Sequence, residues 1–134
     1  MLGMYEWLFE VPGYVPPGWD PERAREALKA AMASEESVVL VAEHRGEPLG
    51  FVTGYLELNS VRFGQRCWIE DLGVSPEHRS EGVGGRLLDA VADWARERGA
   101  THLELDTGLA REDAQRFYER RDPDATGYSY SWSL

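Results

Sequence analysis

Cysteine is almost absent from the sequence, with Cys67 alone among 134 residues. A single cysteine excludes an internal disulfide and a thiolate zinc cluster, and it suits a reducing compartment, so we expect a cytoplasmic protein. No apolar run approaches the roughly 20 residues of a membrane-spanning helix, so no membrane association is expected. The first ten residues, MLGMYEWLFE, carry glutamates where a secretory signal carries basic residues, and no targeting peptide is expected.

Positive charge is also scarce. The chain has 14 Lys and Arg residues against 24 Asp and Glu residues, a net charge of −10, and Lys29 is its one lysine. Such a surface repels nucleic acid and attracts cationic amines, although acidic surfaces also simply keep proteins in solution. With 43% hydrophobic and 28% charged residues, the composition fits one compact domain over residues 1–134.

Several catalytic signatures are missing. The sequence has no G-x-S-x-G, no H-E-x-x-H and no paired-cysteine spacing, which argues against a nucleophilic serine and a zinc hydrolase. We expect His44, His78 and His102 to be surface residues, and no metal is expected. The dinucleotide fingerprint G-x-G-x-x-G lacks its third glycine, where Leu87 stands, and a P-loop needs a Gly-Lys pair, which is absent.

The strongest pattern lies between residues 67 and 98. From Cys67 to Val74, aromatic and branched residues run up to a Ser-Pro pair, which is typical of a strand. From residue 83 to residue 98, apolar residues recur every three or four positions and Gly99 follows, which predicts an amphipathic helix.

Three glycines, Gly82, Gly84 and Gly85, lie where this strand leads into this helix. The first turn of a helix has backbone N–H groups without internal partners, and these can bind a phosphate or pyrophosphate. The glycines alone fit equally well with a tight turn that binds nothing.

The sequence R-x-x-G-x-G, from Arg79 to Gly84, follows I-E-D-L-G-V-S-P-E-H-R and resembles the pyrophosphate loop of the GNAT superfamily of acyl-CoA-dependent N-acyltransferases. The resemblance implies that acetyl-CoA is the co-substrate. It assigns the pyrophosphate to the loop, Arg79, Ser80, Glu81, Gly82, Val83, Gly84 and Gly85. It implies a splayed, bulged edge at the end of the preceding strand, Leu72, Gly73 and Val74, and assigns the pantetheine arm and the thioester carbonyl to that edge.

The other elements agree with an α/β fold of the α+β kind. Helices are predicted at residues 21–33 and 111–121, and strands at residues 38–43, 49–58, 101–106 and 126–134. The resemblance implies a GNAT-like mixed, mostly antiparallel sheet with a splayed central parallel pair, flanked by helices. The first strand of the family is expected to be missing or replaced by residues 5–11.

Acyl transfer to an amine needs a base, because a lysine-like amine is almost wholly protonated at neutral pH. Glu70 and Asp71 are adjacent on the central strand, so we expect them to face opposite ways, and either is a candidate base. Each could equally cap a turn or pair with an arginine.

A second catalytic candidate lies in A-Q-R-F-Y-E, residues 114–119, which resembles the family motif A-x-x-F-Y-E. The resemblance makes Tyr118 the general acid beside the thioester sulfur, whereas its spacing alone suggests a packing residue. Arg111 stands where the family often has asparagine and is a candidate contact to the cofactor.

These observations predict an N-acetyltransferase that moves the acetyl group of acetyl-CoA to a primary amine of a small molecule or protein, by direct attack in a ternary complex. The motifs look most similar to the small-amine and aminoglycoside branch. One alternative is a catalytically degenerate acyl-CoA sensor, and a weaker one is an unrelated nucleotide-binding module. The alternating residues 126–134 make a homodimer an expectation.

Overall fold

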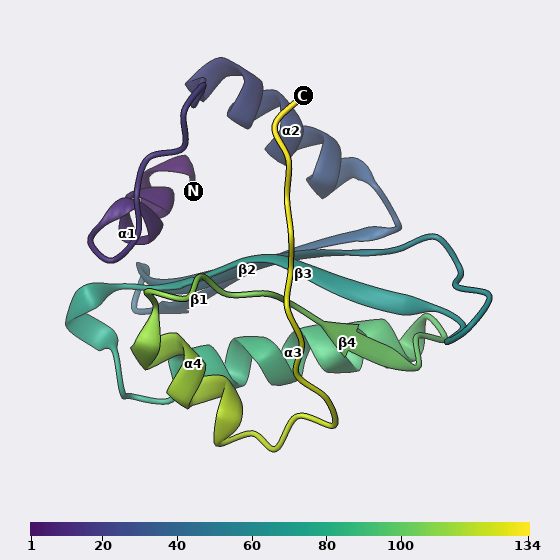
Figure 1. Cartoon of the computed structure of the whole chain (residues 1–134). Helices are drawn as coiled ribbons and strands as arrows, with labels where there is room; N and C mark the ends of the chain where they lie inside the picture. Colours follow the sequence, from purple (N-terminus) through teal and green to yellow (C-terminus); the bar gives the residue numbers. More distant parts are fainter.

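The computed structural model describes residues 1–134 and contains one four-stranded sheet (Figure 1). Its strands lie in the order of the chain, β1 (Ser37–His44), β2 (Glu47–Leu56), β3 (Arg66–Val74) and β4 (His102–Glu104). β1, β2 and β3 pair antiparallel, whereas β4 pairs parallel to β3. The predicted fold class, a mixed and mostly antiparallel sheet flanked by helices, is confirmed.

One face of the sheet carries the main hydrophobic core. Helix α3 (Val83–Glu97) covers this face and buries Val83, Leu87, Val91 and Ala95, which recur every four residues. These side chains pack with the buried strand residues Val38, Val52, Cys67 and Ile69. The apolar period seen in the sequence is therefore the stripe that attaches α3 to the sheet. None of the helices has both the length and the apolar character needed to cross a membrane.

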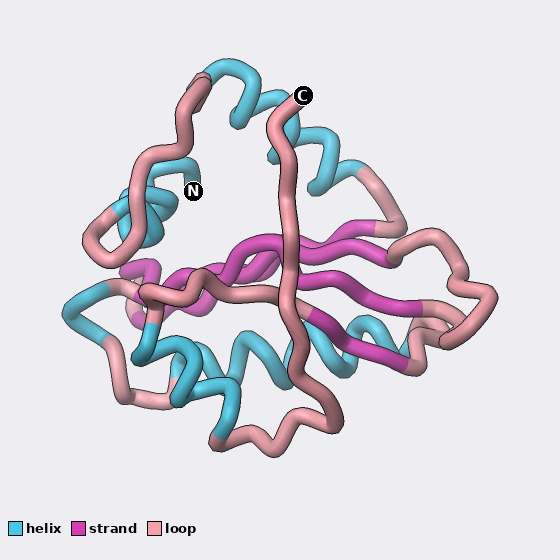
Figure 2. The backbone as a smooth tube through the Cα atoms, viewed as in Figure 1, coloured by secondary structure: helices cyan, strands magenta, loops and turns pink.

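The N-terminal helices cover the opposite face (Figures 1 and 2). They are the 3₁₀ helix η1 (Leu2–Tyr5), the short α1 (Glu6–Phe9) and α2 (Pro21–Ala33). The ring of Tyr5 lies 4.8 Å from the ring of Phe51, a fully buried β2 residue. No strand precedes β1, and the elements before it are all helical. The replacement of a first strand by residues 5–11 stays a prediction.

The start of α2 follows its local sequence. The Asp20 side chain accepts hydrogen bonds from the N–H groups of Glu22 and Arg23, and Pro21 occupies the first helical position. The apolar stripe of α2 is only half-buried, because no α2 residue is fully buried. α2 therefore stands over the sheet without filling the space beneath it.

The parallel pair splays as predicted. β3 and β4 pair over only three positions, which end at Trp68 opposite Glu104, while β3 continues to Val74. The 3₁₀ helix η2 (Pro76–His78) then leads from β3 toward α3, and α4 (Glu112–Glu119) follows β4. The last part of β3 consequently has no strand partner on the side of β4.

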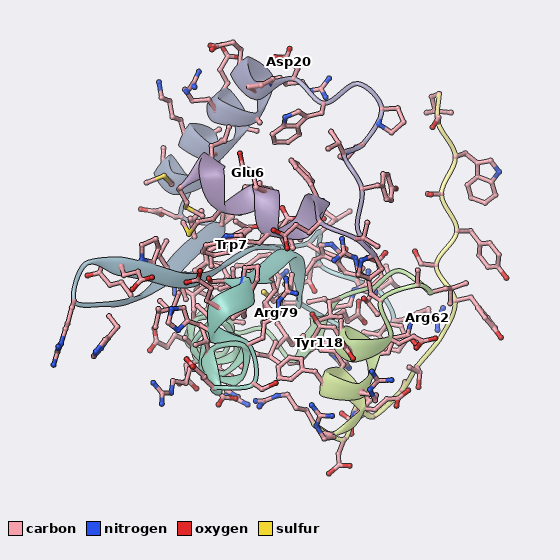
Figure 3. The ribbon with its side chains drawn as sticks, turned by 90° about the vertical axis from the view of Figure 1, so that its left-hand side faces the viewer. Glu6, Trp7, Asp20, Arg62, Arg79 and Tyr118 are labelled. Carbon is pink, nitrogen blue, oxygen red and sulfur yellow. The ribbon has the colours of Figure 1, made fainter.

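The C-terminal segment differs from its prediction. Residues 126–134 were expected to form a closing antiparallel strand, but they form no strand and are exposed throughout. In Figure 1 this segment runs across the strands, and Figure 3 shows it along the outside of the molecule. Its one side-chain tie is a 3.1 Å hydrogen bond from Ser129 to Asp106. Alternation marks two side-chain faces, but a strand also needs a neighbouring edge to pair with.

The position of the core predicts that two leucine-to-alanine substitutions lower the free energy of unfolding by different amounts. Leu87→Ala removes a 4% exposed side chain from the α3 stripe and should lower the free energy of unfolding by about 2–5 kcal/mol. Leu58→Ala, at a 92% exposed position, is the matched control and should change the free energy of unfolding by less than about 0.5 kcal/mol. Urea unfolding followed by circular dichroism measures both values. Equal losses would show that α3 does not pack as described.

Candidate active site

A β-bulge in β3 determines where the two candidate carboxylates point. Thr53 of β2 is opposite Asp71, and Gly54 is opposite Ile69, so Glu70 is an extra residue in β3. Because two residues then oppose one, the normal alternation of side chains is interrupted. Glu70 and Asp71 consequently line the same pocket, and the expectation that they face opposite ways was wrong.

This pocket, here called the carboxylate pocket, encloses about 280 Å³ between the sheet and the N-terminal helices. Its lining comes from the N-terminal segment, α2 and all three antiparallel strands: Leu2, Tyr5, Trp19, Ala24, Ala27, Leu28, Ala31, Ser37, Thr53, Gly54, Tyr55, Glu70 and Asp71. The lining contains two carboxylates and no lysine, arginine or histidine. The pocket therefore favours a positively charged ligand.

Asp71 is the more enclosed carboxylate. Its Oδ2 accepts hydrogen bonds from the hydroxyl of Tyr5, at 2.9 Å, and from the hydroxyl of Thr53, at 3.5 Å. Burial raises the pKa of Asp71, while these two hydrogen bonds and the positive charge of Arg111 oppose the rise. The pKa of Tyr5 is raised by burial and by the Asp71 charge, so its hydroxyl stays protonated and can donate.

The Glu70 side chain accepts a hydrogen bond from a residue of its own strand. The indole Nε1 of Trp68 donates to Glu70 Oε2 at 3.0 Å. Burial and the neighbouring Asp71 charge raise the pKa of Glu70, and the hydrogen bond from Trp68 opposes them. A carboxylate with a raised pKa is a better proton acceptor, so both Glu70 and Asp71 have the electrostatic character of a general base.

The glycine-rich loop presents a row of free backbone donors. No backbone N–H group from Ser80 to Gly85 donates to a protein acceptor, and the first such bond comes from Arg86 to the Gly82 carbonyl. Gly82 has a φ of +84°, a left-handed conformation that favours glycine. An anion at this loop would meet several donors together with the positive end of the α3 dipole.

The side chains around this loop leave its donors accessible. A Cβ on Gly84 would lie 3.5 Å from Phe117, 3.7 Å from Val74 and 3.8 Å from Leu72. These are ordinary van der Waals contacts, so the protein itself does not require a glycine there. The Glu81 carboxylate is held by His78 at 3.0 Å, and Arg79 is exposed. The residues present therefore fit a diphosphate group.

Helix α4, which lies beside α3, carries Tyr118 (Figure 3). Its neighbour Phe117 contacts the Gly84 position, which seats α4 beside the loop. Burial raises the pKa of Tyr118, and the charge of Arg111 opposes the rise, so the phenol carries its proton at neutral pH. A protonated, half-buried phenol is able to act as a proton donor.

Arg111 connects helix α4 with the N-terminal segment. Its Nη2 donates to the Leu8 carbonyl oxygen at 2.8 Å, which links the start of α4 to α1. This contact gives Arg111 a structural task, and its expected contact with the cofactor stays a prediction. The roles assigned to Leu72, Gly73 and Val74 also stay predictions. These residues pair with β2 on one side, and the edge of β3 on the side of β4 has no strand partner there.

The sequence analysis missed several residues of this region. Tyr5 and Thr53 hold Asp71, but Tyr5 lies 66 positions from it, and nothing in the local pattern connects them. Arg121 was also missed. Its Nη1 lies 3.2 Å from where a Cβ on Gly85 would be, and it pairs with Asp89 of α3. Arg121 is therefore a cationic side chain close to the glycine-rich loop.

Comparison with known proteins decides the family. The model of the "Acetyltransferase (GNAT) family" matches residues 1–122. This chain belongs to the GNAT family of acetyltransferases. The GNAT protein is 40% identical over 101 residues to the uncharacterized N-acetyltransferase YhfO of Bacillus subtilis (strain 168), covering 75% of this chain and 68% of that protein.

One further relative of this GNAT protein and one solved structure with a similar fold carry more specific names. Streptothricin acetyltransferase of Streptomyces lavendulae is 39% identical over 71 residues, which cover 53% of this chain and 38% of that protein. The solved structure of AAC(6')-Iy with the bisubstrate analog CoA-S-monomethyl-acetylneamine has a TM-score of 0.82 at 18% identity. That match covers 98% of this chain and 87% of the other, and at this identity it shows the fold alone.

The contacts of Asp71 predict the result of a single substitution. Tyr5→Phe removes a hydrogen bond that stabilises the ionised carboxylate, so the pKa of Asp71 should rise further. Carbon-detected NMR titration of the Asp71 carboxyl group measures this shift. Tyr14→Phe, at a 70% exposed tyrosine, is the matched control and should leave the Asp71 titration unchanged. An unchanged pKa in Tyr5→Phe would contradict the contact.

Proposed function

We propose that this GNAT protein transfers the acetyl group of acetyl-CoA to a primary amine of a small molecule or protein, by direct attack in a ternary complex. The observation that carries the proposal is the pair of carboxylates in one pocket, on the strand whose far edge β4 leaves unpaired. An amine in the carboxylate pocket and a thioester along that edge would meet at β3.

The co-substrate half of the proposal rests on the glycine-rich loop and the end of β3. The free N–H groups from Ser80 to Gly85 would hold the diphosphate, with Arg79 beside them. The unpaired edge at Leu72, Gly73 and Val74 would bind the pantetheine arm, and an N–H group there would polarise the thioester carbonyl. The name of the AAC(6')-Iy complex, which contains a CoA analog, supports this choice of co-substrate.

The proton transfers follow from the two carboxylates and the phenol. Asp71 or Glu70 accepts the proton that the ammonium group must lose before it can attack. The amine nitrogen then bonds to the acetyl carbon, the carbon–sulfur bond breaks, and Tyr118 donates its proton to the departing sulfur. The nitrogen gives up its second proton, which returns to the Tyr118 phenolate through water. Holding the reactants together supplies a further part of the rate, up to roughly 7–11 kcal/mol in ideal intramolecular cases.

The proposal is tested first by ligand stabilisation and turnover. Acetyl-CoA and CoA should raise the melting temperature of the protein and NADH should not, because the loop lacks the third glycine of a dinucleotide site. A thiol-release assay over primary amines should then detect free CoA. Stabilisation by acetyl-CoA without thiol release from any amine would favour an acyl-CoA sensor. Stabilisation by NADH alone would favour a nucleotide-binding module.

The same assay tests the proton donor. Tyr118→Phe should reduce kcat roughly 100-fold or more, because general acid catalysis typically contributes that much, and it should leave the acetyl-CoA affinity unchanged. Tyr14→Phe, far more exposed, should retain the wild-type kcat. Wild-type turnover in Tyr118→Phe would refute the role assigned to the phenol.

We also propose that residues 1–134 act as one domain in the cytoplasm and form a homodimer. The thiol of Cys67 is buried and unpaired, which is compatible with a reducing compartment. The exposed aromatic residues Tyr128, Tyr130 and Trp132 are 85%, 75% and 80% accessible, and a second copy would cover them.

The dimer is tested by mass in solution. Light scattering should give twice the mass of the chain for the wild type and the mass of one chain for the triple variant Tyr128→Ser, Tyr130→Ser, Trp132→Ser. Because these side chains lie outside the core, the triple variant should keep the wild-type circular dichroism spectrum. A monomeric wild-type protein at all concentrations would contradict the dimer.

A further inference from the structure

The carboxylate pocket is built from two unlike halves. Its floor is formed by Glu70 and Asp71 from β3, and its opposite wall by one face of α2. That face contributes Ala24, Ala27, Leu28 and Ala31, spaced by three and four residues, and none of them is fully buried. The apolar stripe of α2 therefore faces the pocket and is available to an apolar part of a ligand.

The floor offers a place for one ammonium group. Asp71 receives both of its protein hydrogen bonds on Oδ2, and Glu70 receives its bond from Trp68 on Oε2. The remaining oxygens, Oδ1 of Asp71 and Oε1 of Glu70, have no donor from the protein. Arg111, outside the lining, is the cation whose charge acts on Asp71.

The walls offer few partners to a polyhydroxylated ligand. Eight of the 13 lining residues are hydrophobic. Of the four hydroxyl groups in the lining, those of Tyr5 and Thr53 already donate to Asp71, which leaves those of Ser37 and Tyr55. Sugar hydroxyls would lose their hydrogen bonds to water on entry and regain few of them, which disfavours binding.

We propose that the acceptor is a small primary amine with a single positive charge and an apolar aliphatic or aromatic body. The ammonium group lies against Glu70 and Asp71, and the apolar body lies against the α2 stripe and the ring of Trp19. This inference rests on the proposed N-acetyltransferase function and names the class of amine that it uses.

The experiment measures both turnover and binding across matched amines. Thiol release with acetyl-CoA gives kcat and KM for ethylamine, butylamine, hexylamine and phenethylamine, and for glucosamine, putrescine and neamine. Calorimetry of the same amines with the CoA-bound protein gives affinities that do not depend on turnover. Phenethylamine and hexylamine should exceed glucosamine and neamine at least tenfold in kcat/KM and in affinity.

The alkylamine series tests the apolar wall directly. Each added methylene should lower KM by about fourfold until the pocket is filled, with little change in kcat, because the wall binds the ground state and the transition state equally. Ala27→Phe fills the pocket and should abolish the advantage of hexylamine over ethylamine. Ala33→Phe, on the exposed side of α2, is the matched control and should retain that advantage.

Failure of this inference is distinguishable from failure of the proposed function. Turnover that prefers glucosamine, putrescine or neamine would overturn the inference and leave the N-acetyltransferase function intact. Absence of thiol release with every amine, together with the predicted order of affinities, would contradict the function and support only the class of amine that the pocket binds. Equal affinity of hexylamine for the wild type and for Ala27→Phe would overturn the inference.

Discussion

The extra residue in β3 is the constraint on which the site depends. Before the bulge, Cys67 and Ile69 face α3, and after it Leu72 and Val74 face the same helix. A strict two-residue alternation would keep Cys67 and Ile69 on the core side but turn Leu72 and Val74 away from it. With one residue inserted, the strand keeps its apolar contacts at both ends and directs two carboxylates toward the opposite face.

The splay of β3 from β4 complements the bulge. Pairing ends beside Trp68, two residues before the bulge, so the strand loses its parallel partner where its carboxylates enter the pocket. On one face of β3 lies the carboxylate pocket, and after the C-terminal end of the strand comes the loop with its unpaired amides. The N-terminal helices, α3 and α4 are thus arranged around a single strand, and Arg111 connects α4 with the N-terminal segment.

The sequence predicted those features that depend on neighbouring residues. The capping of α2 by Asp20 and the apolar period of α3 are local signals, and both helices begin where the sequence indicates. The glycine-rich loop was also found, because its donors come from consecutive residues. The contact between Tyr5 and Asp71 was not found, since it joins distant segments through packing. The resemblance implied a bulged edge at residues 72–74, but the bulge at Glu70 was not predicted, because one inserted residue leaves the strand composition unchanged. Residues 126–134 show that alternation without a partner edge does not make a strand.

The incomplete burial of α2 has an evolutionary consequence. Its residues line the pocket but bury nothing completely, so substitutions there leave the core beneath α3 undisturbed. Mutations that reshape this wall are therefore nearly neutral for folding, whereas changes in β3 alter the core and the pocket together. A lineage could pass from one ligand to another by altering α2 alone, while the strand and loop that form the rest of the site stay constant.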